Sequence, residues 1–215
     1  MIVSSRDAGA STGKLLVFLQ VTMKQRALQS ALEAALPGVE VVAVGRVSDF
    51  QRFISEGVDA VMTLPVVLAA FNLVAQLQGS RAGSTVEKYS LVAVGGTPDP
   101  KRVATVGALD LLGRDGTNAF VRELLEATPR VERVSKVEDL LRLLQAQIAD
   151  AVLLPCRLFT EIRATSNLNL TPFDLAKPVG LPAAVGFSAA GPRVLAALAR
   201  MPTQVAKTLG VDSWR

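Results

Sequence analysis

Histidine is absent from this chain of 215 residues, and Cys156 is its only cysteine. These absences exclude catalytic triads that need histidine, zinc sites with histidine ligands and intrachain disulfides. We therefore expect no metal and no cofactor. Aromatic residues are scarce, at 5% of the chain, although hydrophobic residues make up 50%. The core must consist mainly of valine, leucine and alanine.

Charge and hydropathy exclude two further classes of partner. The chain has 23 basic and 19 acidic residues, but no dense block of lysine and arginine, so we expect no nucleic acid partner. It has no apolar run of 18 residues, so we expect no membrane insertion. Residues 1–13 are polar, which predicts a flexible N-terminal segment, and lack the pattern of an export signal. Two interpretations stay open: a cytosolic protein, or an exported one whose signal is missing from this sequence.

What the chain does contain is an alternation of short apolar strands with amphipathic helices. Residues 15–19 predict a first strand, and Leu28, Leu32 and Leu36 then repeat on one helix face. This alternation favours an α/β fold with mostly parallel sheets and flanking helices. Three predicted helices begin with a capping box, in which a hydroxyl and a carboxyl or amide group cap the helix start: Thr22 with Gln25, Ser48 with Gln51, and Ser135 with Glu138.

Three segments are less regular. Residues 66–77 predict one long helix, and residues 78–88 are polar enough to mark a boundary between lobes. Residues 166–178 contain two prolines and two asparagines, which predicts a loop.

One short sequence occurs twice. Residues 59–65, Asp-Ala-Val-Met-Thr-Leu-Pro, are similar to residues 150–155, Asp-Ala-Val-Leu-Leu-Pro. Each follows an amphipathic helix and each predicts a buried strand that ends at proline. We interpret the pair as the same strand in two similar half-domains that face each other across a cleft; the alternative is a chance similarity. Asp59 and Asp150 lie where these strands start, away from the ligand end, and are interpreted as turn residues rather than a catalytic pair.

The order of these segments resembles the type-2 periplasmic-binding-protein fold, from about Lys14 to Trp214. It is most similar to the small phosphate/phosphonate-type substrate-binding proteins of ABC transporters. The similarity is carried by the following segments: residues 15–36, 50–65, 89–94, 101–106 (Lys-Arg-Val-Ala-Thr-Val), 137–154 and 178–187.

The resemblance implies a two-lobe α/β protein, with lobe one at 14–92 plus 178–215 and lobe two at 93–177. It implies a solute-binding protein of an ABC-type uptake system, which binds a small polar or anionic ligand between the lobes. A membrane permease or a sensor protein is the implied protein partner. The implied location is periplasmic or extracytoplasmic, with the cytoplasm as the alternative.

The best candidate for the binding site is the turn at residues 113–118, Gly-Arg-Asp-Gly-Thr-Asn. Free N–H groups at a helix start suit an anion, and Arg114 can add a charge-assisted hydrogen bond. The alternative is that Asp115 only caps the helix. Gln20 and Thr22 follow the first strand, and Thr63 is a lone polar residue in an apolar strand. The predicted ligand-binding residues are therefore Gln20, Thr22, Thr63, Arg114, Gly116, Thr117 and Asn118.

Two other functions stay open. A binding-protein-like module that senses or scaffolds a protein partner is the main alternative. An enzyme on the same fold is less favoured, because the chain has no histidine and no carboxylate pair at strand ends. Cys156 is interpreted as a small core residue, with a ligand contact as the alternative.

Overall fold

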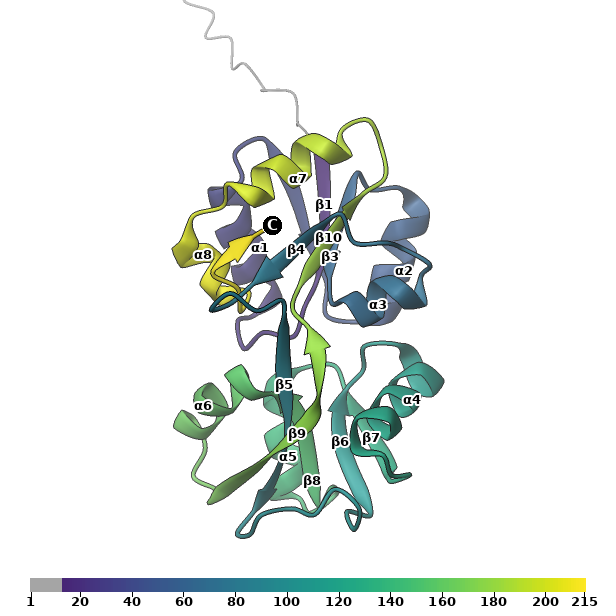
Figure 1. Cartoon of the computed structure of the whole chain (residues 1–215), viewed down its shortest axis with the longest axis vertical. Coiled ribbons are helices and arrows are strands. Elements are labelled where there is room, and N and C mark those ends of the chain that lie inside the picture. The colour runs from purple at the N-terminus through teal and green to yellow at the C-terminus, as the bar shows by residue number, and fades with distance from the viewer. Residues whose placement is uncertain (1–12) are drawn as a thin grey trace, which may run out of the picture.

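The computed structural model describes residues 13–215. They fold into two lobes, one above the other in Figure 1, each a β-sheet with helices packed around it. Residues 1–12, which include most of the segment predicted to be flexible, lie outside the described residues.

Lobe one contains both an early and a late segment of the chain. The early segment comprises β1 (Gly13–Phe18), α1 (Gln25–Ala35), β2 (Val39–Ala43), α2 (Val47–Glu56), β3 (Ala60–Thr63), α3 (Pro65–Ala70) and β4 (Leu77–Ser80). The late segment comprises β10 (Ala183–Gly186), α7 (Gly191–Ala199), α8 (Thr203–Thr208) and β11 (Ser213–Trp214). The strand order is β11-β4-β10-β3-β1-β2, in which only β2, β1 and β3 run parallel.

Lobe two comprises β5 (Val86–Val94), β6 (Thr105–Leu109), α4 (Gly113–Leu125), β7 (Arg130–Val134), α5 (Val137–Gln145), β8 (Ala151–Pro155), α6 (Cys156–Ala164) and β9 (Leu170–Gly180). Its strand order is β7-β6-β8-β5-β9, with β7, β6 and β8 parallel and β5 antiparallel to both its neighbours. Both sheets are therefore mixed. The order matches β2-β1-β3-β10-β4 of lobe one, as two similar half-domains require.

The repeated aspartates occupy matching places in the two lobes. A carboxylate oxygen of Asp59 accepts a hydrogen bond of 2.7 Å from the main-chain N–H of Lys14, at the start of β1. Asp150 accepts one of 2.8 Å from the N–H of Thr105, at the start of β6. Each aspartate thus ties the start of its own strand to the neighbouring strand. The Ser188 hydroxyl donates to Asp59 as well, and these hydrogen bonds lower the pKa of the Asp59 carboxyl.

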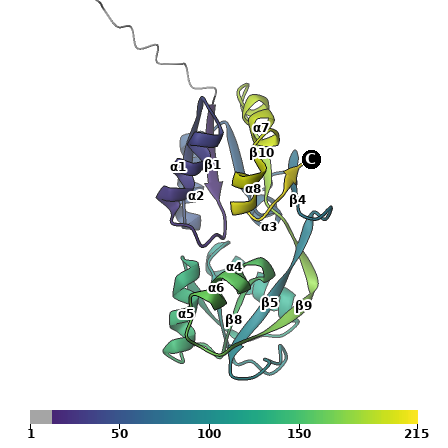
Figure 2. The same ribbon diagram turned by 90° about the vertical axis from the view of Figure 1, so that its left-hand side faces the viewer.

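The strands β5 and β9 form an antiparallel ribbon that connects the lobes, as Figures 1 and 2 show. Its register runs from Val86 opposite Gly180 to Val94 opposite Leu170. The prediction of a loop at 166–178 was therefore wrong from residue 170 onward. Its prolines are compatible with a strand because β9 lies at the edge of the sheet, where a missing N–H donor breaks no inner ladder.

The extent of one predicted helix and the three predicted capping boxes also need correction. The helix predicted at 66–77 ends at Ala70, and Asn72 takes a left-handed conformation (φ 57°) that turns the chain toward β4. None of the three capping boxes forms. The N-cap residues of α1, α2 and α5 are Lys24, Arg46 and Lys136, and none of them makes a side-chain capping hydrogen bond. The predicted hydroxyl caps lie one or two positions away from the true N-caps.

The largest apolar cluster extends through both lobes. From lobe one it includes Phe18 and Phe50, whose ring centroids lie 5.4 Å apart. From the connecting ribbon and lobe two it includes Tyr89 and Phe120, which meet edge to face at 5.7 Å. Two smaller clusters are confined to one lobe each. The lobes are therefore held in apolar contact beside the cleft.

Candidate functional site

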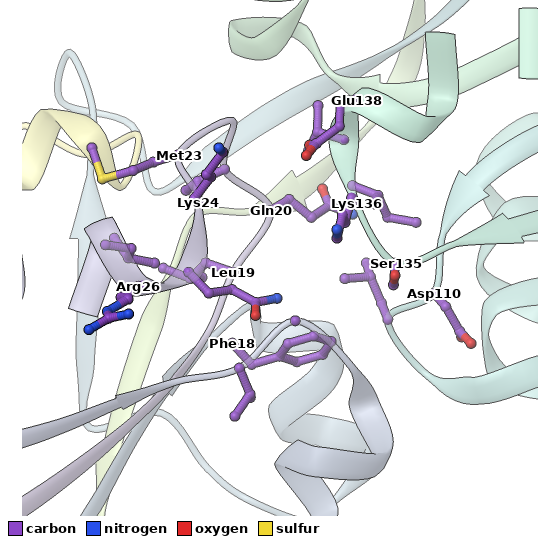
Figure 3. A pocket seen from close by; sticks show the side chains of 18 residues that line it. Phe18, Leu19, Gln20, Met23, Lys24, Arg26, Asp110, Ser135, Lys136 and Glu138 are labelled. Carbon is purple, nitrogen blue, oxygen red and sulfur yellow. The ribbon is translucent and has the colours of Figure 1, made fainter. Parts of the chain in front are cut away.

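A pocket of about 310 Å³ lies between the lobes, and both lobes contribute to its wall (Figure 3). Lobe one supplies the turns after β1 and β2, and lobe two supplies the turns after β6 and β7. These are carboxyl ends of parallel strands, where ligands of open α/β sheets bind. The lining residues are Phe18, Leu19, Gln20, Val21, Met23, Lys24, Gln25, Arg26, Leu28, Val44, Gly45, Leu109, Asp110, Leu111, Ser135, Lys136, Val137 and Glu138.

Two helices from opposite lobes begin at this pocket. Helix α1 follows Lys24 and helix α5 follows Lys136, and both lysines line the pocket. Neither helix has a side-chain cap, so no side chain occupies its first N–H groups. In α5 the N–H of Asp139 donates to the Lys136 carbonyl at 3.2 Å, which leaves the N–H groups of Val137 and Glu138. A helix start also carries partial positive charge, to which a lysine at the same place adds. The first turn of α1 has no acidic residue, whereas that of α5 contains Asp139, which pairs with Arg142, and Glu138, which lines the pocket. The two helix starts therefore make the pocket favourable for an anion.

Gln20 adds a hydrogen-bond donor whose position is fixed. Its side chain is only 5% exposed, and its Oε1 accepts a 2.8 Å hydrogen bond from the Tyr89 hydroxyl. No hydrogen bond joins its Nε2 to another described residue. The Nε2 is not one of the buried atoms that lack a partner, so it stays accessible in the wall of the pocket and free to donate. Figure 3 shows Gln20 beside Lys136 in the wall of the pocket, so an anion there can accept from both.

The acidic side chains of the pocket do not cancel its positive charge. Asp110 is engaged by lobe two itself, since its Oδ2 accepts from Arg133 at 2.8 Å and its Oδ1 accepts from the Thr117 hydroxyl at 3.0 Å. Lys24, Arg26 and Lys136 line the pocket together with Glu138, the one remaining acid among the lining residues. The pocket thus carries more positive than negative charge.

The structure brings one of the predicted lobe-one residues to the pocket. Gln20 lines it. Thr22 is exposed and lines a different pocket, where its hydroxyl donates to a carboxylate oxygen of Glu161 in lobe two. Thr63 is completely buried, and its hydroxyl donates to the Phe18 carbonyl at 2.7 Å. The Thr63 hydroxyl therefore links β3 to β1.

The turn at 113–118 does not line the interlobe pocket. The Thr117 hydroxyl accepts from the N–H of Leu112 at 3.0 Å and donates to Asp110, so the chain itself occupies this helix start. Gly116 has a packing role, because a Cβ atom there would lie 2.6 Å from the Cβ of Leu112. Arg114 and Asn118 face another depression, on lobe two alone.

Cys156 belongs to a small polar cluster at the start of α6. Its thiol lies 3.0 Å from the Ser90 hydroxyl, which in turn donates to Asp174 at 2.7 Å. Burial raises the pKa of the Cys156 thiol, and the nearby carboxylates of Asp174 and Glu87 raise it further. A thiol that stays protonated is a poor nucleophile. The chemistry of this cluster therefore favours a structural role for Cys156.

Residues 13–215 contain neither a cluster suited to a metal ion nor a helix that could span a membrane. Nowhere in this range do three or more Cys, Asp or Glu side chains gather in a way that could hold a metal ion. None of its helices combines the length and apolarity needed to cross a membrane.

Sequence reasoning missed Lys24, Lys136 and Asp110 as pocket residues. Their only signal was position, because each lies in a turn that follows a strand, β1, β7 and β6 respectively. The predicted capping boxes drew attention to Thr22 and Ser135, whereas the helices begin after the neighbouring lysines. Surface lysines are common, so a lysine after a strand does not by itself indicate a binding site. Lys24 and Lys136 become informative because the structure shows that both helix starts share one pocket.

Comparison with solved structures shows which known proteins share this fold. No protein-family model and no curated protein matches the chain. Among solved structures, arginine-bound ArgBP from T. maritima matches with a TM-score of 0.58 and 15% identity, over 93% of this chain and 96% of that one. A periplasmic His/Glu/Gln/Arg/opine family-binding protein from Silicibacter pomeroyi in complex with lysine matches with a TM-score of 0.59 and 13% identity, over 91% and 94%.

A third similar structure is the periplasmic VFT2 domain of BvgS from Bordetella pertussis, with a TM-score of 0.54, 13% identity and 92% coverage of both chains. At such low identity these matches establish the fold alone. The chain has the two-lobe α/β fold of type-2 periplasmic binding proteins, as the order of its segments predicted. The phosphate or phosphonate class within that fold stays a prediction.

Proposed function

We propose that this protein binds a small anionic solute in the pocket between its lobes and acts as the solute-binding component of an uptake system. The observation that carries the proposal is the meeting of two uncapped helix starts, each with a lysine, at one interlobe pocket. Phosphate, phosphonate or carboxylate groups fit this chemistry, because they accept several N–H hydrogen bonds at once. The non-enzymatic role, the periplasmic or extracytoplasmic location and a permease partner are parts of the same proposal.

Binding would act through both lobes. Lys24 and the start of α1 come from lobe one, and Lys136 and the start of α5 come from lobe two. An anion held by both would favour the arrangement in which the lobes are close, and the β5–β9 ribbon is the place where they can bend. Ligand binding would thus reduce the distance between the lobes.

The proposal is tested with a panel of phosphate, phosphite, alkylphosphonates, sulfate, carboxylates and amino acids in a thermal-shift assay. A ligand at 100 times its Kd stabilises the protein by about 2.7 kcal/mol, enough to raise Tm by several degrees. We expect one anion to raise Tm, and we expect Lys136→Ala to abolish the rise. Arg200→Ala is the control, because Arg200 is exposed at the end of α7, outside the ribbon, and lines none of the pockets described above. An equal loss in both variants would contradict the proposal.

A second variant tests the amide donor. Gln20→Glu keeps an oxygen that can accept from the Tyr89 hydroxyl but replaces the free amide with negative charge. We expect it to abolish anion binding while the protein stays folded. Unchanged affinity would place the ligand elsewhere.

One observation favours the alternative, a module that recognises a protein partner. The largest apolar cluster is shared by both lobes, so they are already packed together without a solute. If no compound in the panel raises Tm, and small-angle scattering shows one lobe arrangement throughout, the partner-binding function becomes the better explanation.

A further inference from the structure

A second basic depression lies on lobe two, away from the interlobe pocket. Helix α4 and the edge strand β7 lie side by side there (Figure 1). Arg114, Asn118 and Arg122 are spaced four residues apart and so share one face of α4. With the chain from Pro129 to Arg133 they enclose about 460 Å³. We call this depression the arginine pocket.

The charges of the arginine pocket are unbalanced. It is lined by four arginines, Arg114, Arg122, Arg130 and Arg133, and Glu132 is its only acidic lining residue. Glu132 pairs with Arg130 at 2.6 Å, and Arg133 pairs with Asp110, which lies outside the arginine pocket. Arg114 and Arg122 form no ion pair with any described residue. Like charges gathered in this way repel one another, and a bound anion would relieve that repulsion.

Asn118 adds an amide group to the wall of the arginine pocket. Its Oδ1 is buried and has no hydrogen-bond partner, and no described residue accepts from its Nδ2. An anion cannot satisfy this oxygen, which is an acceptor, but it can accept from the Nδ2 group of the same side chain. An amide beside four guanidinium groups can provide a further N–H donor to an anion.

We propose that the arginine pocket binds a compact, multiply charged phosphate chain, such as that of pyrophosphate or a nucleoside triphosphate. Guanidinium groups bind phosphate through paired N–H donors, and a chain of phosphates presents several such oxygen pairs at once. Its lining residues are not among those of the interlobe pocket, so the proposal does not depend on the proposed function. This second site would let the protein respond to a phosphate compound as well as to its cleft ligand.

The test is isothermal titration of the full chain with tripolyphosphate at about 0.1 M salt, where interactions beyond about 10 Å are largely screened. The test variant is Arg114→Gln/Arg122→Gln. The matched control is Arg193→Gln/Arg200→Gln, which removes the same charge from exposed arginines at either end of α7 in lobe one. We expect the affinity to fall by roughly tenfold or more in the test variant and to change by less than about twofold in the control.

Further measurements separate the alternatives. Lys136→Ala should leave tripolyphosphate binding intact, and orthophosphate should bind much more weakly than tripolyphosphate. The proposal is overturned if tripolyphosphate does not bind, if both arginine pairs matter equally, or if Lys136→Ala alone abolishes binding. It is also overturned if an acidic peptide binds there more tightly than tripolyphosphate, since the site would then recognise a protein segment.

Discussion

The guanidinium group of Arg157, in the first turn of α6, donates a 3.0 Å hydrogen bond to the main-chain carbonyl of Gln20 in lobe one. Arg157 also forms an ion pair of 3.4 Å with Glu87 on the connecting ribbon, and their side chains are only 5% and 9% exposed. Both Glu87 carboxylate oxygens and the Arg157 Nε lack hydrogen bonds. A buried charge pair therefore joins lobe two, the ribbon and the loop that carries Gln20.

Removal of Arg157 alone should be costly. Arg157→Met leaves the Glu87 charge buried without a partner, and we expect the free energy of unfolding to fall by about 3–5 kcal/mol. The double variant Arg157→Met/Glu87→Gln removes both charges and should regain much of that loss. Urea denaturation of Arg157→Met, Glu87→Gln and the double variant gives the coupling energy between the two side chains. Additive effects would show that the pair is not coupled.

The same pair predicts a dependence of stability on pH. Burial raises the pKa of the Glu87 carboxyl, and nearby Arg157 and Arg81 only partly oppose that rise. A carboxyl with a higher pKa in the folded protein binds more protons when folded, so its contribution to stability is lost as pH rises from the ordinary value of 4.5 through the folded pKa.

Glu87→Gln removes this titration. Relative to the wild type, the variant should therefore gain stability as pH rises from about 4 to about 7, whatever its stability at the lower limit. Urea denaturation of both proteins across this range measures the difference. Other titrating groups, including Asp59 with its lowered pKa, are common to both proteins and cancel. A difference that stays constant with pH would contradict the prediction.

Thr63 tests whether a buried hydroxyl binds ligand or holds the sheet. Thr63→Val keeps the shape but removes the donor to the Phe18 carbonyl, and we expect a loss of about 1–3 kcal/mol in stability. Thr63→Ser keeps the hydroxyl, so most of the cost should vanish. Anion affinity, measured by titration, should be unchanged in both. If Thr63→Val lost anion affinity but kept normal stability, Thr63 would be a ligand-binding residue and the prediction would be wrong.

Gly180 ends the connecting ribbon against α3. A Cβ atom at this position would lie 2.5 Å from Cγ of Pro65. Gly180→Ala should therefore reduce stability by about 1–3 kcal/mol through overpacking. Gly96→Ala is the matched control, because nothing lies within 4 Å of a Cβ at Gly96. Thermal unfolding of the two variants provides the comparison, and equal Tm values would show that the ribbon end can shift freely.

Much of the fold was predictable because its signals are local. The leucines at 28, 32 and 36 correctly indicated the buried face of α1, and the repeated Asp-Ala-Val correctly indicated β3 and β8. The strand β9 was missed for a physical reason. Its polar residues and prolines are those of a loop, and only pairing with β5 makes it a strand.

The site was less predictable. Gln20 was predicted because it follows the first strand, and it lines the interlobe pocket. Lys24 and Lys136 were not predicted, because nothing near either lysine indicates the other. The residues singled out at 114 and 118 do face a depression, but it is the arginine pocket rather than the cleft.

By itself, the sequence determined the alternation of strands and helices, the repeated half-domain and the lack of histidine chemistry, since composition and periodicity are properties of neighbouring residues. Only the tertiary structure decided which loops meet. Lys24 and Lys136 belong to different lobes, and they share a pocket because of the strand order in each sheet and the ribbon between them. Those contacts depend on long-range pairing and packing, which no local pattern specifies.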